Sequence, residues 1–239
     1  MKDQNLLIKK NISGWAKTNS VKSFILEPKS KFQLKKIVKN AKPKSIIPRG
    51  LGRSYGDAAQ LKDKFVVNLK HFNSFKISKK DKIITAGGGV SLDQILKFII
   101  PKGFFIPVSP GTKNVTIGGS IACDVHGKNH HINGSFGAHI LEIKLIDGNA
   151  NDKILRPNDP DINLQNQFWA TIGGMGLTGI IYEAKFKLIE IETSLVSVDT
   201  FRYKDLNSLM KAMIKVDKKY NYSVAWIDPL HSNKRGILT

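Results

Sequence analysis

Apolar residues along this chain recur with two different periods, and each period predicts a different kind of element. Short apolar runs that end at proline, glycine or polar residues are typical of buried strands. Apolar residues spaced three and four positions apart follow Ser30 and Ser91. Both serines are good helix caps, so we expect amphipathic helices to begin there. The apolar positions are Phe32, Leu34, Ile37 and Val38 in the first helix and Leu92, Ile95, Leu96 and Ile99 in the second.

The same mixture continues to the end of the chain. We expect strands at residues 21–27, 45–47, 65–69, 83–86, 140–146, 179–191 and 223–227, and further helices at 163–170 and 206–216. Asp147 and Gly148 form a turn signature that joins the strand before them to a partner at 153–155, as in a hairpin. Strands and helices in this order predict the α+β class.

Three glycines lie within seven residues directly after the predicted strand at 45–47. Residues 47–57 read Ile-Pro-Arg-Gly-Leu-Gly-Arg-Ser-Tyr-Gly-Asp. Glycine backbone can approach a ligand closely, and successive N–H groups in such a turn form a nest for a phosphate. Arg49 and Arg53 would add charged donors. The segment is neither a Walker loop nor a Rossmann fingerprint, so a plain glycine-rich connection stays open for this loop taken alone.

Two more glycine clusters favour a shared ligand site. Gly118 and Gly119 open a run of small residues that would form a short helix, whose N-terminus suits a flat or anionic ligand. Residues 171–181 read Thr-Ile-Gly-Gly-Met-Gly-Leu-Thr-Gly-Ile-Ile and lead into a strand. Clusters so far apart predict one extended ligand that several turns contact. This interpretation requires Gly52, Gly118 and Gly176 to share one cleft.

A family resemblance emerges from these clusters and from the run His-Gly-Lys-Asn-His-His at 126–131. The segments 49–57, 110–112, 115–131, 134–137 and 168–181 together resemble the PCMH-type FAD-binding domain of the vanillyl-alcohol-oxidase family of flavoproteins. The resemblance extends from about Gly14 and Trp15 to the last residue. It implies a two-lobed FAD-binding domain at residues 10–190, with lobes at about 10–75 and 76–190. The beginning of a substrate domain would follow at 191–239.

The resemblance further implies that the substrate domain continues beyond Thr239 and then returns to the FAD domain. We therefore expect the chain to be the N-terminal part of a longer enzyme. A catalytic lysine and part of the flavin face would come from the part that is missing, which puts the activity of the chain alone in question.

The cofactor contacts are likewise implied by the resemblance. Two loops would hold the diphosphate, a third would lie along the isoalloxazine ring, and one strand residue would contact the adenine or ribose end. Many relatives link FAD covalently through a histidine where this chain has Arg53, so we expect the FAD to be non-covalent. The implied contacts are Pro48, Arg49, Gly50, Leu51, Gly52, Arg53, Ser54, Tyr55, Gly56, Asp57 and Ala58 in the first loop, Gly111, Thr112, Thr116, Ile117, Gly118, Gly119 and Cys123 in the second, His126, Gly127, Lys128 and Asn129 in the third, and Ile181.

His126 and Tyr55 are the candidate catalytic residues. Oxidation of an alcohol by flavin needs a base for the hydroxyl proton and a C–H bond directed at the ring. We expect His126 beside the flavin and Tyr55 in the same pocket, with core packing as the alternative for Tyr55. The histidines at 126, 130 and 131 lack a partner carboxylate or thiolate at the usual spacing, so we predict no metal site. Asp57 and Asp124 are expected to fix loops by accepting from backbone N–H groups.

Charge adds one question. The chain has 38 Lys and Arg against 19 Asp and Glu, a formal charge of +19. Abundant Lys, Asn and Ile is what an AT-rich genome produces, and attraction to an anionic bilayer or a polyprenyl phosphate is the functional alternative. The lysines are scattered through all segments, so we predict no nucleic-acid partner.

Localisation follows from what the sequence lacks. No apolar run approaches the roughly 20 residues of a membrane span, and the first ten residues do not form a secretory signal. The single cysteine, Cys123, excludes an internal disulfide and suits a reducing compartment. We expect a cytoplasmic protein, or one that is peripheral at the inner face of the membrane.

The function that the resemblance implies is FAD-dependent oxidation of a sugar hydroxyl. The first expectation is the 2′-hydroxyl of a polyprenyl-phospho-ribose, a lipid-linked sugar phosphate, which becomes the 2′-keto sugar on the way to cell-envelope arabinose precursors. An NAD(P)H-dependent keto-reductase would be the partner, and a quinone or oxygen would be the electron acceptor. An aldose-lactone or alditol oxidase on the same domain is the alternative, and a catalytically inert FAD-binding fragment is a second one.

Overall fold

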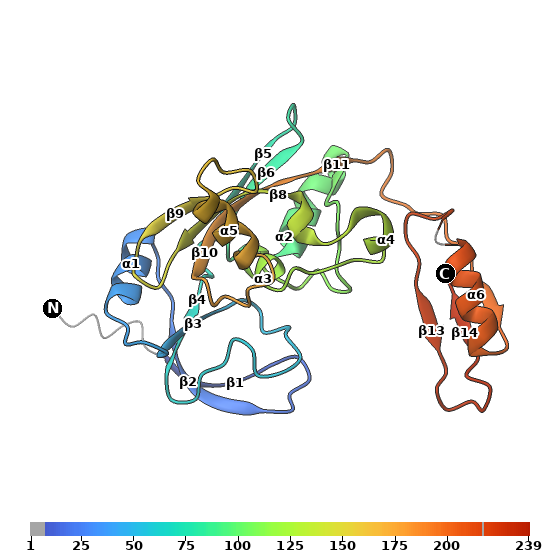
Figure 1. Ribbon diagram of the computed structural model, residues 1–239, viewed down its shortest axis with the longest axis horizontal. Coiled ribbons are helices and arrows are strands. Elements are labelled where there is room, and N and C mark those ends of the chain that lie inside the picture. Colours follow the sequence, from blue (N-terminus) through green and yellow to red (C-terminus); the bar gives the residue numbers. More distant parts are fainter. Residues whose placement is uncertain (1–7, 217) are drawn as a thin grey trace.

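Two β-sheets form the main body of the computed structural model, which describes residues 8–216 and 218–239 (Figure 1). The first sheet has the strand order β1-β2-β4-β3. Its strands are β1 (Ile8–Ser13), β2 (Ser20–Leu26), β3 (Ile46–Arg49) and β4 (Phe65–Asn68). Strand β4 runs parallel to both β2 and β3. Helix α1 (Lys31–Lys39) is the crossover from β2 to β3, and residues 50–64 connect β3 to β4.

The second sheet is antiparallel throughout, with the order β5-β6-β10-β8-β9. Its strands are β5 (Phe75–Ser78), β6 (Ile83–Gly87), β8 (Ile140–Ile146), β9 (Asp152–Leu155) and β10 (Ile180–Lys187). The helices that follow its strands are α2 (Leu92–Ile99), α3 (Ile117–Ala122), the single turn α4 (His130–Asn133) and α5 (Ile162–Thr171). The short strands β7 (Phe104–Phe105) and β11 (Ile189–Glu190) pair beside it. The fold is therefore α+β, as the sequence predicts.

Two clusters of buried side chains hold the body together. The larger joins the second sheet to α2, α3 and α5, and its largest fully buried side chains are Phe136, Phe168 and Phe186. The smaller joins α1 and β4 to the second sheet through Leu34, Val38, Val67, Leu69, Ile146, Ala150, Ile180 and Tyr182. The two sheets thus share a core, and α1 closes one end of it.

Both predicted serine caps are confirmed. Ser30 accepts a hydrogen bond from the backbone N–H of Gln33, and Ser91 forms a reciprocal capping box with Gln94. Phe32 is the exception in the predicted apolar stripe, because its side chain is 77% exposed. Leu34 and Val38 are four residues apart and face the core, whereas Phe32 lies on the opposite side of the helix.

The predicted long strand at 179–191 is wrong in one respect. It is interrupted at Leu188, a buried residue, and continues as β11 with β7 as its new partner. Strand β1 was not predicted, because its sequence Ile-Lys-Lys-Asn-Ile-Ser is mostly exposed and carries almost no apolar alternation.

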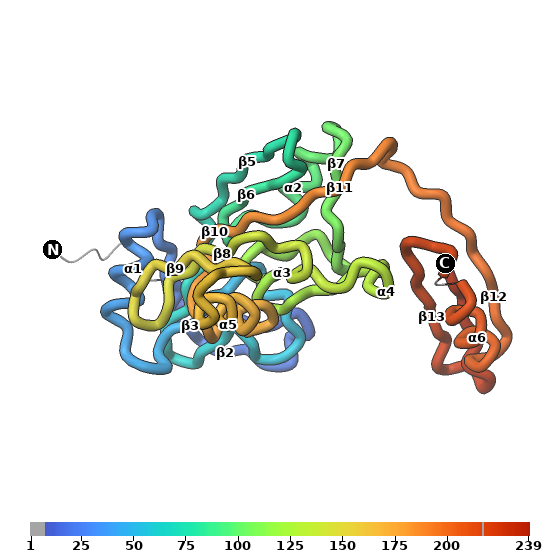
Figure 2. The backbone as a smooth tube through the Cα atoms, turned by 45° about the horizontal axis from the view of Figure 1, so that its top comes forward, coloured from blue at the N-terminus to red at the C-terminus, as the bar shows by residue number. Residues whose placement is uncertain are grey.

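A smaller unit follows the second sheet. It contains β12 (Phe201–Tyr203), α6 (Leu206–Val216), β13 (Ala225–Ile227) and β14 (Gly236–Leu238), with β14 between the other two strands. Leu209 of α6 and Leu238 form its buried centre. An extended segment leads to it from β11, and the unit lies to one side of the body in both views (Figure 2). No described helix has the length and hydropathy to cross a membrane.

Asp152 connects α1 to the second sheet. Its carboxylate accepts from the Tyr182 hydroxyl at 2.8 Å and from the Lys31 ammonium at 2.7 Å. Burial acts to raise the pKa of this carboxyl, but the hydrogen bonds from Lys31 and Tyr182 outweigh burial and hold the pKa below its ordinary value. Burial first, and then the bond to Asp152, raises the pKa of the Tyr182 hydroxyl well above its ordinary range.

We expect Asp152→Asn to lower the free energy of unfolding at neutral pH by about 1–2 kcal/mol, because it weakens two hydrogen bonds to a charged group. The folded-state pKa is depressed, so this contribution is present above the unfolded pKa of about 3.9 and is lost as the pH falls through the folded pKa. Urea unfolding at about pH 7 and about pH 3 measures this. The difference between wild type and variant should shrink at the lower pH, while exposed Glu192→Gln should show no difference at either. An undiminished Asp152→Asn effect at low pH would contradict the assignment.

Candidate cofactor site

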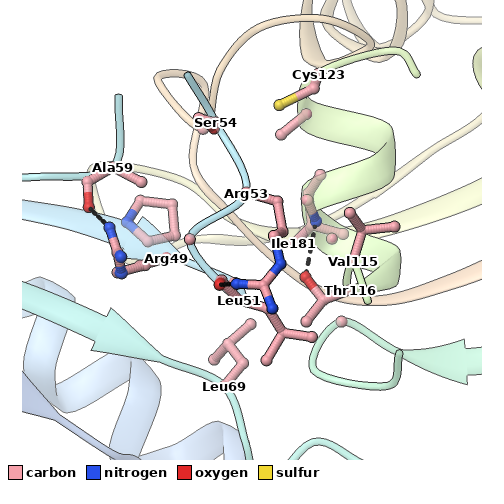
Figure 3. Close-up of a pocket in the computed structure, with 18 of the residues that line it drawn as sticks. Arg49, Leu51, Arg53, Ser54, Ala59, Leu69, Val115, Thr116, Cys123 and Ile181 are labelled. Atoms are coloured by element: carbon pink, nitrogen blue, oxygen red, sulfur yellow. Dashed lines mark hydrogen bonds between the residues drawn. The ribbon is translucent and has the colours of Figure 1, made fainter. Parts of the chain in front are cut away.

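The first glycine cluster forms the loop that leaves β3, and Arg49 closes the base of this loop. Its guanidinium donates to the backbone carbonyl of Ala59 at 3.1 Å (Figure 3). It also donates to the backbone carbonyl of Ser13 at 2.6 Å. Burial lowers the pKa of Arg49 from its ordinary value. Arg49 therefore connects the loop to β1, and at least two of its N–H donors are bonded to main-chain carbonyls.

Two contacts hold the Arg53 side chain at the same loop. Its guanidinium donates to the Leu51 carbonyl at 3.0 Å and lies 5.2 Å from the centre of the Trp15 ring. The backbone N–H of Trp15 in turn donates to the Ser54 carbonyl at 2.7 Å. The turn between β1 and β2 thus contacts the loop through Trp15 and holds it in place.

The second cluster begins α3. The Thr116 hydroxyl caps this helix by accepting from the Gly119 N–H at 3.1 Å. The Gly118 N–H donates to the Gly88 carbonyl at 3.0 Å, which fixes the start of the helix on the end of β6. A Cβ on Gly50 would strike the Thr116 hydroxyl oxygen, so the first loop can rest against this cap only because residue 50 is glycine.

The third cluster is a turn that contacts the other two clusters. Met175 donates its N–H to the Ala122 carbonyl at 2.8 Å, and Gly173 donates to the Ile121 carbonyl at 3.0 Å. Gly176 has a φ of +78°, a left-handed conformation that favours glycine, and a Cβ there would lie 2.8 Å from Cγ of Pro48. The turn is therefore bonded to α3 and packed against β3.

All three clusters line one cavity of about 450 Å³, so Gly52, Gly118 and Gly176 share a cleft as the sequence interpretation requires. Fourteen of the residues singled out from the sequence lie in its wall. They are Pro48, Arg49, Gly50, Leu51, Gly52, Arg53, Ser54, Tyr55, Ala58, Thr116, Gly118, Gly119, Cys123 and Ile181. Figure 3 shows several of them converging from the loop, from α3 and from β10.

Other residues singled out from the sequence lie outside this wall. Ile117 is fully buried in the core, and Gly111 is exposed. The rest of this group is Gly56, Asp57, Thr112, His126, Gly127, Lys128 and Asn129. The wall also has members that the sequence analysis missed, among them Gly88 and Gly89, which belong to a run of three glycines at the end of β6. That run, read together with the other clusters, was the available signal.

The histidine run forms a separate turn beside the cavity. Val125 lines the cavity and His126 follows it, exposed and bridged to Ser135. The rings of His126 and His130 meet edge to face with centroids 5.9 Å apart. His130 Nδ1 lies 3.2 Å from the Gly127 carbonyl, which agrees with a structural role. In the described part of the chain, no three His, Cys, Asp or Glu side chains are placed to hold a metal ion.

This turn also contacts the unit that follows the second sheet. Nε2 of His131 lies 3.1 Å from the Tyr220 carbonyl, and the Ser223 N–H donates to the Lys128 carbonyl at 3.0 Å. Asp124 accepts from the Gly137 N–H at 2.9 Å, which confirms its expected role in fixing the loop. Tyr55 lines the cavity with 76% of its surface exposed, so it is available to a ligand and is not packed in the core.

The wall fits a dinucleotide in shape and charge. A Cβ on Gly119 would meet only the Thr116 hydroxyl, at 3.1 Å, and would otherwise occupy the cavity. The cations among the described residues of the wall are Arg49, Arg53 and Lys70, and that wall has no carboxylate. Lys70 pairs with Glu27, and Arg49 donates to two main-chain carbonyls. Arg53 and the backbone N–H groups of the loop after β3 are therefore the groups left to face a diphosphate.

A family comparison decides the assignment. Residues 23–156 match the family described as FAD binding domain. The chain belongs to this FAD-binding family. The match includes the first two glycine clusters and the histidine run, and it identifies FAD as the cofactor that the cavity fits.

Individual relatives agree with the family match. The chain is 37% identical over 230 residues to decaprenylphosphoryl-beta-D-ribose oxidase of Mycolicibacterium smegmatis, an alignment that covers 92% of this chain and 48% of the relative. It is 23% identical to D-lactate dehydrogenase of Archaeoglobus fulgidus, over 82% of this chain and 45% of the relative. It is 27% identical to L-gulonolactone oxidase 3 of Arabidopsis thaliana, over 69% and 28%. The chain spans about half the length of the Mycolicibacterium relative.

We expect Gly119→Val to weaken FAD binding at least about tenfold, because the added side chain would occupy the cavity. Titration of the apoprotein with FAD, followed by the change in flavin fluorescence, measures the dissociation constant. Gly148→Val is the matched control, because a Cβ at Gly148 meets nothing and this residue lies in the turn between β8 and β9. Equal affinities for the two variants, both with unchanged melting temperature, would contradict the site.

Proposed function

We propose that this chain is the FAD-binding part of an oxidase that converts the 2′-hydroxyl of a polyprenyl-phospho-ribose to a ketone, with the FAD held non-covalently. The observation that supports it best is the single cavity built from three glycine clusters, in a chain that is 37% identical to a decaprenylphosphoryl-ribose oxidase over 92% of its length. The lactone oxidase relative is less similar and covers less of the chain, so the lactone or alditol alternative is not favoured.

The residues of the wall would divide the cofactor between them. The loop at 48–58 would bind the diphosphate through backbone N–H groups, as at other glycine-rich anion sites. The N–H groups at the start of α3 are bonded within the protein, so Gly118 and Gly119 would contribute by letting the cofactor lie directly against main chain. Arg53 would add a charge, and its stacking on Trp15 would keep its guanidinium on the loop. Bound FAD would supply the hydride acceptor.

The chain's own part in the chemistry would be to orient the sugar and to receive a proton. His126 is exposed and follows directly on the cavity-lining Val125, so we propose it as the base for the sugar hydroxyl. Tyr55 would hold the sugar from the opposite loop. The contacts of His131 and Lys128 with residues 220 and 223 would fix the histidine turn against the substrate-binding segment.

The organisation and partners of the enzyme belong to the same proposal. Residues 10–190 would form the FAD-binding domain, with lobes at about 10–75 and 76–190 that correspond to the two sheets. Residues 191–239 would begin the substrate domain. The 2′-keto product would pass to an NAD(P)H-dependent keto-reductase, and a quinone or oxygen would reoxidise the flavin. A cytoplasmic location with peripheral association at the inner membrane face would suit a lipid-linked substrate.

We expect a short-chain prenyl-phospho-ribose to bleach the visible absorbance of the FAD-loaded chain under anaerobic conditions. An alditol, a sugar lactone and D-lactate are each tested in its place and should leave the absorbance unchanged. Heating the same preparation should release the flavin into the supernatant, because no covalent link retains it. Bleaching by a lactone or alditol, but not by the lipid-linked sugar, would contradict the substrate assignment. Bound flavin that no substrate bleaches would show the inert fragment instead.

We expect His126→Ala to slow this flavin reduction about 10²-fold or more while FAD affinity stays within about threefold, because loss of a general base affects the proton transfer and not the cofactor wall. Stopped-flow absorbance measures the rate. His71→Ala is the control, because His71 is exposed and lies outside the wall. If both variants reduced at the wild-type rate, another group would have to be the base.

A further inference from the structure

One segment of the chain is strongly basic and has no acidic residues. Residues 28–56 contain seven lysines and two arginines, and neither Asp nor Glu occurs among them. All seven lysines lie between Lys29 and Lys44, in α1 and the residues on either side of it. The nearest acidic residues in the sequence are Glu27 and Asp57, on either side of this block.

The outer face of α1 carries two of these lysines together with an exposed aromatic ring. Phe32, Lys36 and Lys39 are spaced four and three residues apart and therefore share one face of the helix. Leu34 and Val38 occupy the opposite face and are buried. Phe32 is 77% exposed, so its ring contributes little to the core. We call Phe32 and the exposed lysines Lys29, Lys36, Lys39, Lys42 and Lys44 the α1 patch.

The lysines of the patch are not paired with acidic side chains in the described part of the chain. Lys31, on the side of α1, pairs with Asp152 and fixes the helix to the body. A further cation lies next to the patch, because the Lys64 ammonium donates to the Lys44 carbonyl at 3.1 Å. Lys36 and Lys39 also lie in the last turn of α1, where the helix dipole favours positive charge.

The patch is open to a large partner. In both views α1 lies at the end of the body opposite to the unit formed by β12, α6, β13 and β14 (Figures 1 and 2). Neither that unit nor the cavity wall includes a residue of the patch. A broad planar partner could therefore contact the patch without covering the cofactor site.

We propose that the α1 patch binds the surface of an anionic lipid bilayer, with the lysines at the phosphate headgroups and the Phe32 ring inserted at the interface. Clustered lysines are attracted to acidic lipid headgroups, and an aromatic or aliphatic side chain beside them adds interfacial anchoring. The exposed ring favours a bilayer over nucleic acid as the partner. The phosphate backbone of a nucleic acid would bind the same lysines, but it offers no apolar layer for the ring to enter. Proteins that stack nucleic-acid bases use several aromatic side chains, and the patch has only Phe32.

The test uses the FAD-loaded chain and measures cosedimentation with phosphatidylglycerol vesicles and with phosphatidylcholine vesicles at low salt. The triple variant Lys36→Gln, Lys39→Gln, Lys42→Gln removes three charges from the patch. The control triple Lys76→Gln, Lys79→Gln, Lys80→Gln removes three exposed charges at β5 and its following turn. Both variants have the same net charge, so simple attraction between a basic protein and an acidic surface predicts the same loss for both.

We expect the patch triple to lose about a hundredfold in affinity for phosphatidylglycerol vesicles, since each lysine near an anionic surface contributes a factor of about five. The control triple should lose less than about threefold. Phe32→Ser should lose about tenfold with an unchanged melting temperature, because the ring is exposed in the folded protein. Wild type should bind phosphatidylcholine weakly, and salt should weaken its binding to phosphatidylglycerol.

Equal losses for the two triples, or full binding by Phe32→Ser, would overturn the proposal. A duplex DNA titration completes the comparison. If the patch triple lost DNA binding while wild type failed to bind phosphatidylglycerol, the patch would be a nucleic-acid surface. FAD content and flavin reduction are measured in every variant and should not change, so the outcome is independent of the proposed oxidase activity.

Discussion

The arrangement of this protein depends on close contact between three stretches of main chain that carry almost no side chains. The loop after β3 rests on the cap of α3 at Gly50, and the turn at Gly176 rests on Pro48. Hydrogen bonds from Gly118, Gly173 and Met175 fix the second and third stretches to each other and to the end of β6. Any side chain at the contact positions would separate these stretches, so the cavity exists because glycine occupies them.

The loop that lines the cavity is held in place by hydrogen bonds to main chain. Arg49 bonds the loop to β1 and to its own far end, and Trp15 bonds it to the turn between β1 and β2. The smaller core places α1 and the first sheet against the second. A cofactor that spans the cavity would therefore contact both sheets at once. Its affinity would depend on how well these contacts hold the two sheets in position relative to each other.

Much of this could be predicted from the sequence where the signal is local. Ser30 and Ser91 cap helices because cap chemistry involves residues only three positions apart. The glycine clusters identified the cavity because glycine is needed wherever main chain approaches closely. Phe32 was assigned to the core because apolar spacing alone does not show how wide a face the neighbours cover. Gly88 and Gly89 were missed because their role depends on which distant segment packs on them, the start of α3 for Gly88 and the backbone of Leu69 and Phe72 for Gly89.

The histidine turn shows the same limit. Its sequence indicates a functional loop, but the contacts of His131 with Tyr220 and of Lys128 with Ser223 join segments about ninety residues apart, and only the fold reveals them. These contacts place the turn between the cavity and the unit that follows the second sheet. Under the proposed function, His126 would lie where the cofactor and the substrate-binding segment meet.

Amide hydrogen exchange of the apoprotein with and without FAD tests the central claim most directly. If the three glycine stretches enclose one cofactor, FAD should slow exchange in segments 50–56, 116–122 and 173–179 together, at the same FAD concentration and with the same midpoint. Protection confined to one of these segments, or three different midpoints, would contradict a single shared site.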